Sequence, residues 1–277
     1  MKRNATFLLV FAILICVAAP YASAAEEPMQ VGVYFDGERI DRRGLSFSED
    51  GKVYVPLSEL CEQFESSSMS WDKDRGEAQV LSDGLEFKIT EGCDYVLAND
   101  RTIYMEDAYR DIDGVLMVPA RQICQLFGAE VSWNGKTKNL FIYDTGEPLE
   151  SGTTFYDEDE LYWLSRIIQA ESGGECLEGK IAVGNVIMNR VESDMFPDTV
   201  YDVIFDRRCG IQFSPAYSGS IYNEPCEEAV IAAKLVLEGV VVTENALYFT
   251  PNRSAETCWA SRNRPYDTQI GGHTFFA

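Results

Sequence analysis

A duplication in the N-terminal half most constrains how this chain can fold. Residues 53–64 (VYVPLSELCEQF) and 116–127 (LMVPARQICQLF) share an apolar strand, a proline and an apolar helical pattern, and each copy runs on to a Ser-Trp pair and an alternating stretch. Proline favours the first turn of a helix, and apolar residues at i, i+3, i+4 and i+7 from Leu57 predict one buried helix face. A β-hairpin that turns at Asn134-Gly135 follows the second helix. The sequence therefore predicts a small α+β module built from two βαββ-type repeats.

These repeats resemble the copper amine oxidase N-terminal-like domain, a module of exported bacterial proteins. The pattern VxVPxRxxxxxxGxxVxWxxxxxxxxI fits residues 116–143 well and the first copy more loosely. The resemblance implies an α+β unit over residues 29–145 that serves in targeting, spacing or wall association, with catalysis elsewhere. Because this region has no histidine, we expect it to bind no copper. Residues 146–156, which contain Pro148, Ser151 and Gly152, are expected to form a linker.

Residues 1–24 have the pattern of a signal peptide. Lys2 and Arg3 precede an apolar run over residues 7–19, and Ala22-Ser23-Ala24 supplies an A-x-A cleavage site. The run is too short to span a bilayer comfortably, and no other segment approaches the required length. We therefore expect a protein that is secreted or resides in the cell wall or spore envelope, with no membrane span in the mature chain.

The chain is strongly acidic. Its formal charge of −22 becomes −24 once the two positive charges of Lys2 and Arg3 are removed. Such a surface is repelled by nucleic acid and by anionic lipids. We therefore expect no nucleic-acid partner, and a polymeric substrate would have to be held by hydrogen bonds and stacking.

The supply of metal ligands is poor. The chain has eight cysteines but a single histidine, His273, and none of its cysteines forms a CxxC pair. A Cys/His zinc site is therefore not expected, and we predict neither a metal nor a cofactor. Packing is the favoured role for His273, and also for Cys61 and Cys124 on the buried faces of the two repeat helices.

One acidic residue ends an apolar helical stripe in the C-terminal half. Leu161, Leu164, Ile168 and Glu171 fall at i, i+3, i+7 and i+10 and so share one helix face. A carboxyl group set against an apolar wall has a raised pKa, which suits a general acid that protonates a glycosidic oxygen. Spacing alone leaves open the alternative that Glu171 caps a core helix and faces solvent. Gly173-Gly174 should end the helix through a left-handed residue.

The rest of this half is mostly helical. Asp157 is a plausible N-cap for the first helix, with Glu160 at the third position. A helix over residues 178–193 is apolar nearly all round and should be central. We also expect helices over residues 200–205 and 225–238, the latter starting from Asn223 and stopping at Gly239. Strands are expected over residues 246–250 and 270–276.

This half resembles the SleB-type cell-wall hydrolase family. Six segments match in order: RIIQAESGGE (166–175), GKIAVGNVIMNRV (179–191), FPDTVYDVIF (196–205), QFSP (212–215), ALYFTP (246–251) and IGGHTFFA (270–277). The resemblance implies a mostly helical, lysozyme-like domain over residues 157–277 that cleaves peptidoglycan glycan strands. It places the family's catalytic glutamate at Glu171. The Glu171-Ser172 pair also resembles the Glu-Ser pair of lytic transglycosylases.

The number of carboxylates separates two mechanisms. Hydrolysing glycosidases use two, whereas a lytic transglycosylase can use one, which protonates the leaving oxygen and then takes a proton from the muramic acid 6-hydroxyl. Glu175 is the candidate second carboxylate, with binding of backbone amides as its alternative role.

Further substrate-binding candidates follow from the same segments. Four of them have a structural alternative: Ser172 bonds to Glu171 or caps its helix, Asn189 ties helices together, Gln212 sits in a turn, and Phe213 is a buried aromatic. The Tyr248 hydroxyl is expected to steady the oxocarbenium ion or the reacting hydroxyl. The candidate substrate-binding set is Ser172, Glu175, Asn189, Gln212, Phe213 and Tyr248.

The signal-peptide pattern predicts an exported protein, and the family resemblance implies an enzyme that cleaves peptidoglycan between N-acetylmuramic acid and N-acetylglucosamine. Its fold class is α+β, a small duplicated module followed by a lysozyme-like catalytic domain. A lytic transglycosylase is favoured, with spore cortex as a candidate substrate. A hydrolysing muramidase and a non-catalytic peptidoglycan-binding protein are the alternatives. A regulatory protein partner is conceivable but is not identified by the sequence.

Overall fold

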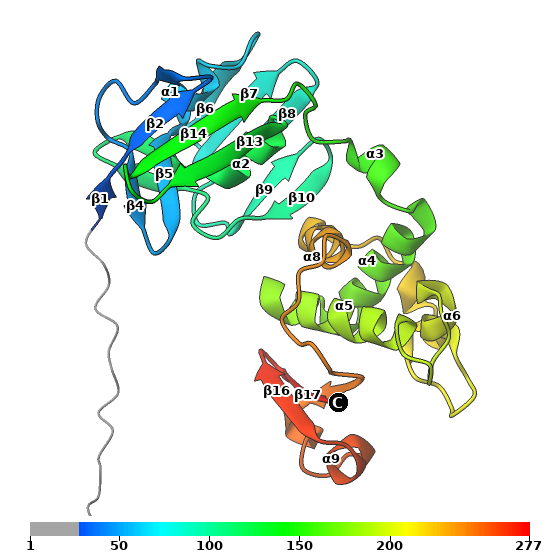
Figure 1. Cartoon of the computed structure of the whole chain (residues 1–277). Coiled ribbons are helices and arrows are strands. Elements are labelled where there is room, and N and C mark those ends of the chain that lie inside the picture. Colours follow the sequence, from blue (N-terminus) through cyan, green and yellow to red (C-terminus); the bar gives the residue numbers. More distant parts are fainter. Residues whose placement is uncertain (1–27) are drawn as a thin grey trace, which may run out of the picture.

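A strand-rich N-terminal part is followed by a largely helical C-terminal part that carries a small sheet (Figure 1). The structure, a computed structural model, describes residues 28–277. The predicted signal peptide over residues 1–24 lies outside these residues. The arrangement confirms the α+β fold class. No helix within residues 28–277 has both the length and the apolar character needed to cross a membrane.

The two sequence repeats form the predicted elements. In the first repeat, β5 (Lys52–Pro56) leads into α1 (Leu57–Cys61) and the hairpin of β6 (Ser68–Asp72) and β7 (Glu77–Ser82). In the second, β12 (Val115–Pro119) leads into α2 (Ala120–Leu126) and the hairpin of β13 (Ala129–Asn134) and β14 (Asn139–Asp144). Each proline ends its strand as the N-cap residue of the helix, one position earlier than the first turn.

Pairing of the repeats organises the N-terminal sheets. Strands β5 and β12 pair antiparallel, with Val55 opposite Val118. Phe64 and Phe127, which occupy equivalent positions in the two repeats, stack face to face with ring centroids 3.9 Å apart. The remaining strands are β1 (Met29–Gln30), β2 (Gly32–Phe35), β3 (Glu38–Arg39), β4 (Phe47–Glu49), β8 (Leu85–Thr90), β9 (Tyr95–Ala98), β10 (Arg101–Tyr104) and β11 (Arg110–Ile112). They complete sheets of order β1-β4-β5-β12-β11, β10-β9-β8-β7-β6 and β13-β14-β2-β3.

The cysteines of the repeat helices are core residues. Cys61 and Cys124 are buried in the same apolar cluster as Leu57, Leu60 and Ile123, and neither forms a disulfide with another cysteine of residues 28–277. Burial raises the pKa of Cys61 to about 11 and that of Cys124 to about 12, so both thiols stay protonated at neutral pH. The packing role predicted for them is confirmed.

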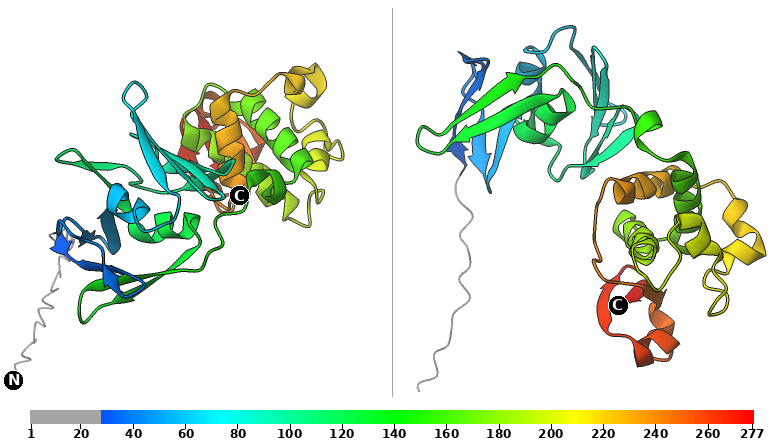
Figure 2. Two further views of the ribbon diagram at one scale, coloured as in Figure 1. Left: turned by 90° about the horizontal axis from the view of Figure 1, so that it is seen from above. Right: turned by 45° about the vertical axis from the view of Figure 1, so that its right-hand side comes forward.

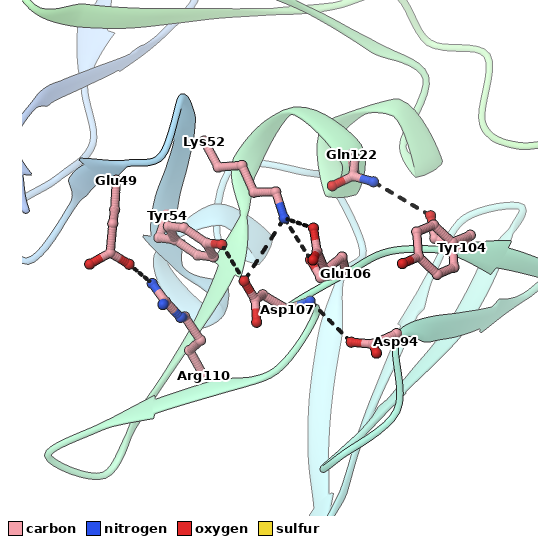
Figure 3. Close-up of polar contacts among 9 residues, drawn as sticks. All are labelled: Glu49, Lys52, Tyr54, Asp94, Tyr104, Glu106, Asp107, Arg110 and Gln122. Carbon is pink, nitrogen blue, oxygen red and sulfur yellow. Dashed lines mark hydrogen bonds and ion pairs between the residues drawn. The ribbon is translucent and has the colours of Figure 1, made fainter. Parts of the chain in front are cut away.

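A polar cluster joins β5 to the segment before β11 (Figure 3). The Lys52 ammonium lies 2.7 Å from a carboxylate oxygen of Glu106 and 3.9 Å from one of Asp107. The Tyr54 hydroxyl donates to Asp107 at 3.3 Å, and the Arg110 guanidinium stacks 4.5 Å from the centre of the Tyr54 ring. These contacts hold the loop that connects the two repeats against the first repeat.

The helices of the C-terminal part gather around one central helix. Helix α5 (Leu177–Val191) contacts α4 (Glu158–Ser172), α6 (Val200–Phe205), α8 (Glu227–Leu237), β15 (Tyr248–Pro251) and β16 (Tyr266–Ile270). Its near-complete burial confirms the central place predicted for it. At Gly184 a side chain would begin 2.8 Å from Val236 and 3.0 Å from Ile168, so glycine allows α8 and α4 to approach closely.

The other elements of this part are short. They are α3 (Gly152–Phe155), α7 (Pro215–Ser218), η1 (Ser220–Tyr222), η2 (Asn252–Ser254), α9 (Trp259–Asn263) and β17 (His273–Phe276). Strand β17 lies between β15 and β16. The segment expected as one strand over residues 270–276 therefore comprises the last residue of β16, a turn at Gly271-Gly272, and β17.

Some of the predicted helix ends agree with the structure and others do not. Asp157 caps α4, accepting from the Glu160 amide at 3.0 Å, as expected. Gly239 ends α8 with a φ of +88°, also as expected. Helix α4 ends at Ser172, before Gly173-Gly174 as predicted, but the left-handed residue expected there was wrong. The φ of Gly173 is −54°, because the chain continues in a right-handed turn in which the Glu175 amide donates to Ser172. Asn223 does not cap α8 either, since that helix begins after Cys226 and Asn223 ends η1 instead.

The two parts meet at the predicted linker. Residues 146–156 are partly ordered against the N-terminal part, where the Leu149 amide donates to Leu126, and they include α3. The Gly152 amide donates to Asn99 at 2.7 Å, and α8 contacts β10 across the junction. Figure 2 shows α3 between the strands and the helical bundle.

Candidate active site

Glu171 lies on the apolar face of α4, one residue before the helix ends. Leu164 and Ile168 on the same face are fully buried, and the Glu171 side chain is half-buried beside them. Within residues 28–277 no hydrogen bond or ion pair reaches its carboxylate. Burial is the sole cause of its shift and raises the pKa of Glu171 to about 7. This is the environment that the apolar stripe predicted.

A carboxyl group with this pKa can work in both directions at neutral pH. Protonated and ionised forms are then present in similar amounts, so Glu171 can donate a proton and later accept one. An ordinary exposed glutamate would be almost entirely ionised and would make a poor proton donor. The geometry therefore favours the acid–base reading of Glu171 over the solvent-facing cap.

The Ser172 hydroxyl bonds within its own helix. Its side chain is buried, and the hydroxyl donates to the Ile168 carbonyl at 2.7 Å within the same helix. This is the helix-end role that was the structural alternative for Ser172, and its substrate-binding role stays a prediction. The hydroxyl thus closes the last turn of α4.

Glu175 is engaged by the turn between β16 and β17. It accepts from the Gly272 amide at 2.7 Å, and its other oxygen lies 3.8 Å from Nδ1 of His273. A side chain at Gly271 or Gly272 would collide with this carboxylate. Glu175 therefore takes the alternative role considered for it, the binding of a backbone amide.

Asn189 and Phe213 also have structural partners. The Asn189 amide donates to the carbonyls of Thr243 and Ala246, at 3.3 and 3.0 Å, and so ties α5 to the segment before β15. Phe213 is buried, with its ring centroid 6.4 Å from that of Phe249. Both side chains thus have the contacts of their structural alternatives, and their substrate-binding roles stay predictions.

Gln212 and Tyr248 share the wall of one pocket of about 780 Å³. The Gln212 amide donates weakly to Gly210 at 3.4 Å, and the Tyr248 hydroxyl accepts from Arg264 at 3.1 Å. Glu171 is not among the residues that line this pocket. Of the six substrate-binding candidates, these two are placed where a ligand could reach them.

The same pocket brings in residues that the sequence did not single out. Its full lining is Met195, Phe196, Asp206, Arg208, Cys209, Gln212, Tyr248, Trp259 and Arg264. These residues come from separate loops and short elements, so no periodic pattern marks them. Behind the wall lies Arg190, and a charged residue near the end of a mostly apolar helix was the one available signal.

His273 is a packing residue, as expected. It is buried, with its ring edge-on to Phe249 at 5.3 Å. Burial lowers the pKa of His273 below its ordinary value, and the nearby Glu175 opposes this only in part. The ring is therefore neutral at neutral pH.

Two protein families match the chain, one for each part. The family described as Cell Wall Hydrolase matches residues 174–276, and the family described as Copper amine oxidase N-terminal domain matches residues 34–142. The first match begins three residues after Glu171. The chain is thus a member of the cell wall hydrolase family through its C-terminal part and carries a copper amine oxidase N-terminal domain ahead of it.

Individual relatives are spore enzymes. A spore cortex-lytic enzyme of Oceanobacillus iheyensis is 35% identical over 130 residues, which are 47% of this chain and 46% of that protein. One of Bacillus cereus is 36% identical over 131 residues, 46% of this chain and 49% of that protein. The chain therefore matches about half the length of these curated relatives.

A solved structure also matches this part. It is the catalytic domain of the germination-specific lytic transglycosylase SleB from Bacillus anthracis, which is 35% identical. The alignment covers 47% of this chain and 100% of that domain, with a TM-score of 0.40.

Proposed function

We propose that this protein cleaves the glycan strands of peptidoglycan as a lytic transglycosylase, with Glu171 as its general acid and base. The observation that carries this proposal is the carboxyl group of Glu171, half-buried on an apolar helix face, without a protein partner among residues 28–277 and with a pKa of about 7. Support comes from the 35% identity to a domain described as a lytic transglycosylase.

The reaction needs one carboxyl group that changes protonation state. Protonated Glu171 gives its proton to the oxygen between N-acetylmuramic acid and N-acetylglucosamine as the glycosidic bond breaks. The resulting carboxylate takes the proton of the muramic acid 6-hydroxyl, whose oxygen then bonds to the anomeric carbon. The product is a 1,6-anhydro sugar, the proton returns to Glu171, and no water is consumed.

The engagement of Glu175 favours this course over hydrolysis. A hydrolysing muramidase needs a second carboxylate, as a nucleophile or to activate water. Glu175 is the nearest acidic residue in sequence, but its oxygens face the Gly272 amide and His273. We therefore favour the single-carboxylate mechanism, outside the cytoplasm, on wall or spore cortex peptidoglycan.

Digestion of purified sacculi tests the proposal. We expect Glu171→Gln to lose at least about a thousandfold in the release of soluble fragments, because the amide can neither give nor take the proton. Glu178→Gln, which removes an exposed carboxylate from the first turn of α5, is the matched control. Circular dichroism should show that both variants fold. Undiminished release by Glu171→Gln would refute the assignment.

Mass spectrometry of the wild-type products separates the mechanisms. Anhydro-muropeptides support the transglycosylase, whereas reducing muramic acid ends would indicate a hydrolysing muramidase. Binding to sacculi without any soluble product would indicate a non-catalytic wall-binding protein. Parallel digests of spore cortex and vegetative wall show which peptidoglycan is the better substrate.

A further inference from the structure

The 780 Å³ pocket is surrounded by arginine side chains. Arg208 and Arg264 line it, and Arg190 lies behind two of its rings, with the guanidinium carbon 4.7 Å from the centre of Phe196 and 5.3 Å from that of Tyr248. This is an unusual concentration of positive charge in a chain with a formal charge of −22.

The charges at the pocket do not balance. Asp206 is the one carboxylate among the lining residues, and it is paired with Arg208 at 3.1 Å. Within residues 28–277, Arg190 and Arg264 form no ion pair with a carboxylate. Asp206 acts on Arg190 only at longer range, and burial lowers the pKa of Arg190 to about 10, so its guanidinium remains charged at neutral pH.

Both arginines also have unused donors. Nη1 of Arg190 and Nε of Arg264 are buried and have no acceptor in the described part of the chain. Buried guanidinium donors without an acceptor cost free energy, and a carboxylate supplies the planar pair of oxygens that fits them. Arg264 is the accessible member of the pair, because it lines the pocket while Arg190 is almost fully buried.

Aromatic rings complete the site. Trp259 is 58% exposed, an unusual state for a tryptophan, and its ring centroid lies 5.6 Å from that of Tyr248. The Arg264 guanidinium lies over both rings, at 5.0 Å from Tyr248 and 5.6 Å from Trp259. Exposed ring faces of this kind can cover the apolar face of a sugar, while the adjacent guanidinium meets an attached anion.

We propose that this pocket is a subsite for a muramyl unit that carries a carboxylate, with Arg264 as the anion-binding residue and Trp259 as the stacking surface. The choice of saccharide rests on the proposed function. In peptidoglycan this carboxylate has two mutually exclusive sources: the lactyl group where the unit carries no stem peptide, and the stem peptide itself where it is attached through the lactyl carbonyl. N-acetylglucosamine carries neither, so the pocket would set which sugar of the alternating strand lies in it.

Fluorine NMR of the full chain labelled with 5-fluorotryptophan provides the test, with the Trp259 signal assigned through Trp259→Phe. The probes are N-acetylmuramic acid, its lactyl methyl ester, muramyl dipeptide and N-acetylglucosamine. We expect N-acetylmuramic acid to shift the Trp259 signal saturably. Its methyl ester and N-acetylglucosamine should bind at least about tenfold more weakly. Tighter binding of muramyl dipeptide than of the ester would identify the stem peptide as the source, and preference for the free acid would identify the lactyl group.

Variants assign the effect to one side chain. Arg264→Gln should weaken binding of N-acetylmuramic acid about tenfold. Arg264→Lys keeps the charge but not the planar pair of donors, so its affinity should lie between those of the wild type and Arg264→Gln. Arg262→Gln, an exposed arginine on α9, removes the same charge nearby and should change nothing. The signals of the other three tryptophans report whether each variant is folded.

Equal binding of the acid, the ester and N-acetylglucosamine would overturn the proposal, as would the absence of a saturable shift with both acids. Because these probes are not cleaved, the titration does not depend on Glu171. Failure of the subsite and failure of the proposed catalytic role would thus appear in different experiments.

Discussion

Arg101 of the N-terminal part and Glu238 of the C-terminal part form a bidentate ion pair. Nε and Nη2 of Arg101 donate to the two oxygens of Glu238 at 2.8 and 2.6 Å, and both side chains are almost fully buried. The Tyr156 hydroxyl also donates to Glu238 at 2.7 Å, and the Arg101 guanidinium stacks on the Phe155 ring at 3.4 Å. The N-terminal part therefore packs against the end of helix α8 and is not connected to it by a flexible linker alone.

Loss of this ion pair should loosen the junction. Glu238→Gln leaves the buried Arg101 guanidinium without its countercharge, so we expect a loss of about 3 kcal/mol in the free energy of unfolding. We also expect faster proteolysis within residues 146–156, which the docked domains protect. Urea unfolding and limited proteolysis measure the two effects.

The control for this variant is Glu244→Gln, which neutralises an exposed carboxylate in the loop after α8. It should leave both properties unchanged. If Glu238→Gln behaved like this control, the ion pair would not hold the domains together.

The raised pKa of Glu171 should appear in the pH dependence of stability. Its folded-state pKa of about 7 lies above the ordinary value of 4.5, so the folded protein holds this proton more tightly than the unfolded chain does. The stability contributed by this group is full below about pH 4.5 and is lost as the pH rises toward and through 7. The total loss should be about 2–3 kcal/mol.

Glu171→Gln isolates this effect from other titrating groups, because it stays neutral throughout. We expect the variant to match the wild type near pH 4.5 and to exceed its stability by about 2–3 kcal/mol at pH 8.5. Urea unfolding at several pH values gives the comparison. Parallel pH profiles for the two proteins would show that Glu171 is an ordinary exposed carboxylate.

The same pKa sets an expectation for activity. The first proton transfer needs the protonated form of Glu171, so kcat/KM on sacculi should fall about tenfold for each pH unit above 7. Turbidity loss of sacculi, followed from pH 5 to 9, measures this. A rate that held constant to pH 9 would exclude Glu171 as the proton donor in the rate-limiting step.

The sequence predicted elements where the pattern was local. The limits of α6 agree with the predicted segment, and both repeats formed the predicted strand, helix and hairpin, because hydrophobic spacing and proline act over a few residues. Helix ends were less predictable: Asn223 is a good capping residue, but its backbone ends a neighbouring turn. Gly173 has the freedom for a left-handed conformation and does not use it.

The residues of the candidate site were also predictable only where the signal was local in sequence. Glu171 could be found because its environment comes from its own helix. For Ser172, Asn189 and Phe213 the sequence could not separate a substrate-binding role from a structural one, because their partners lie on the backbone or in the core, which a motif does not reveal. Arg264 and Trp259 were missed because only the packing of α9 beside Tyr248 and Phe196 brings them into one pocket.

The contact between Glu175 and the turn at Gly271 should contribute to the stability of the fold. Gly271 has a φ of +55°, and a side chain there would collide with the Glu175 carboxylate. Gly271→Ala should therefore lower the free energy of unfolding by about 2–3 kcal/mol, from backbone strain and from displacement of the carboxylate. In a Glu175→Ala background the collision is absent, and the same change should cost only about 1 kcal/mol, the strain alone.

A double-mutant cycle measured by urea unfolding gives the coupling between the two positions. We expect about 1–2 kcal/mol, since the residues are in direct contact. Gly239→Ala, which introduces a side chain at a φ of +88° with nothing nearby, is the control for strain without collision. If the cost of Gly271→Ala were the same in both backgrounds, Glu175 would not be held at this turn. Its carboxylate would then be free to serve as the second carboxylate of a hydrolase.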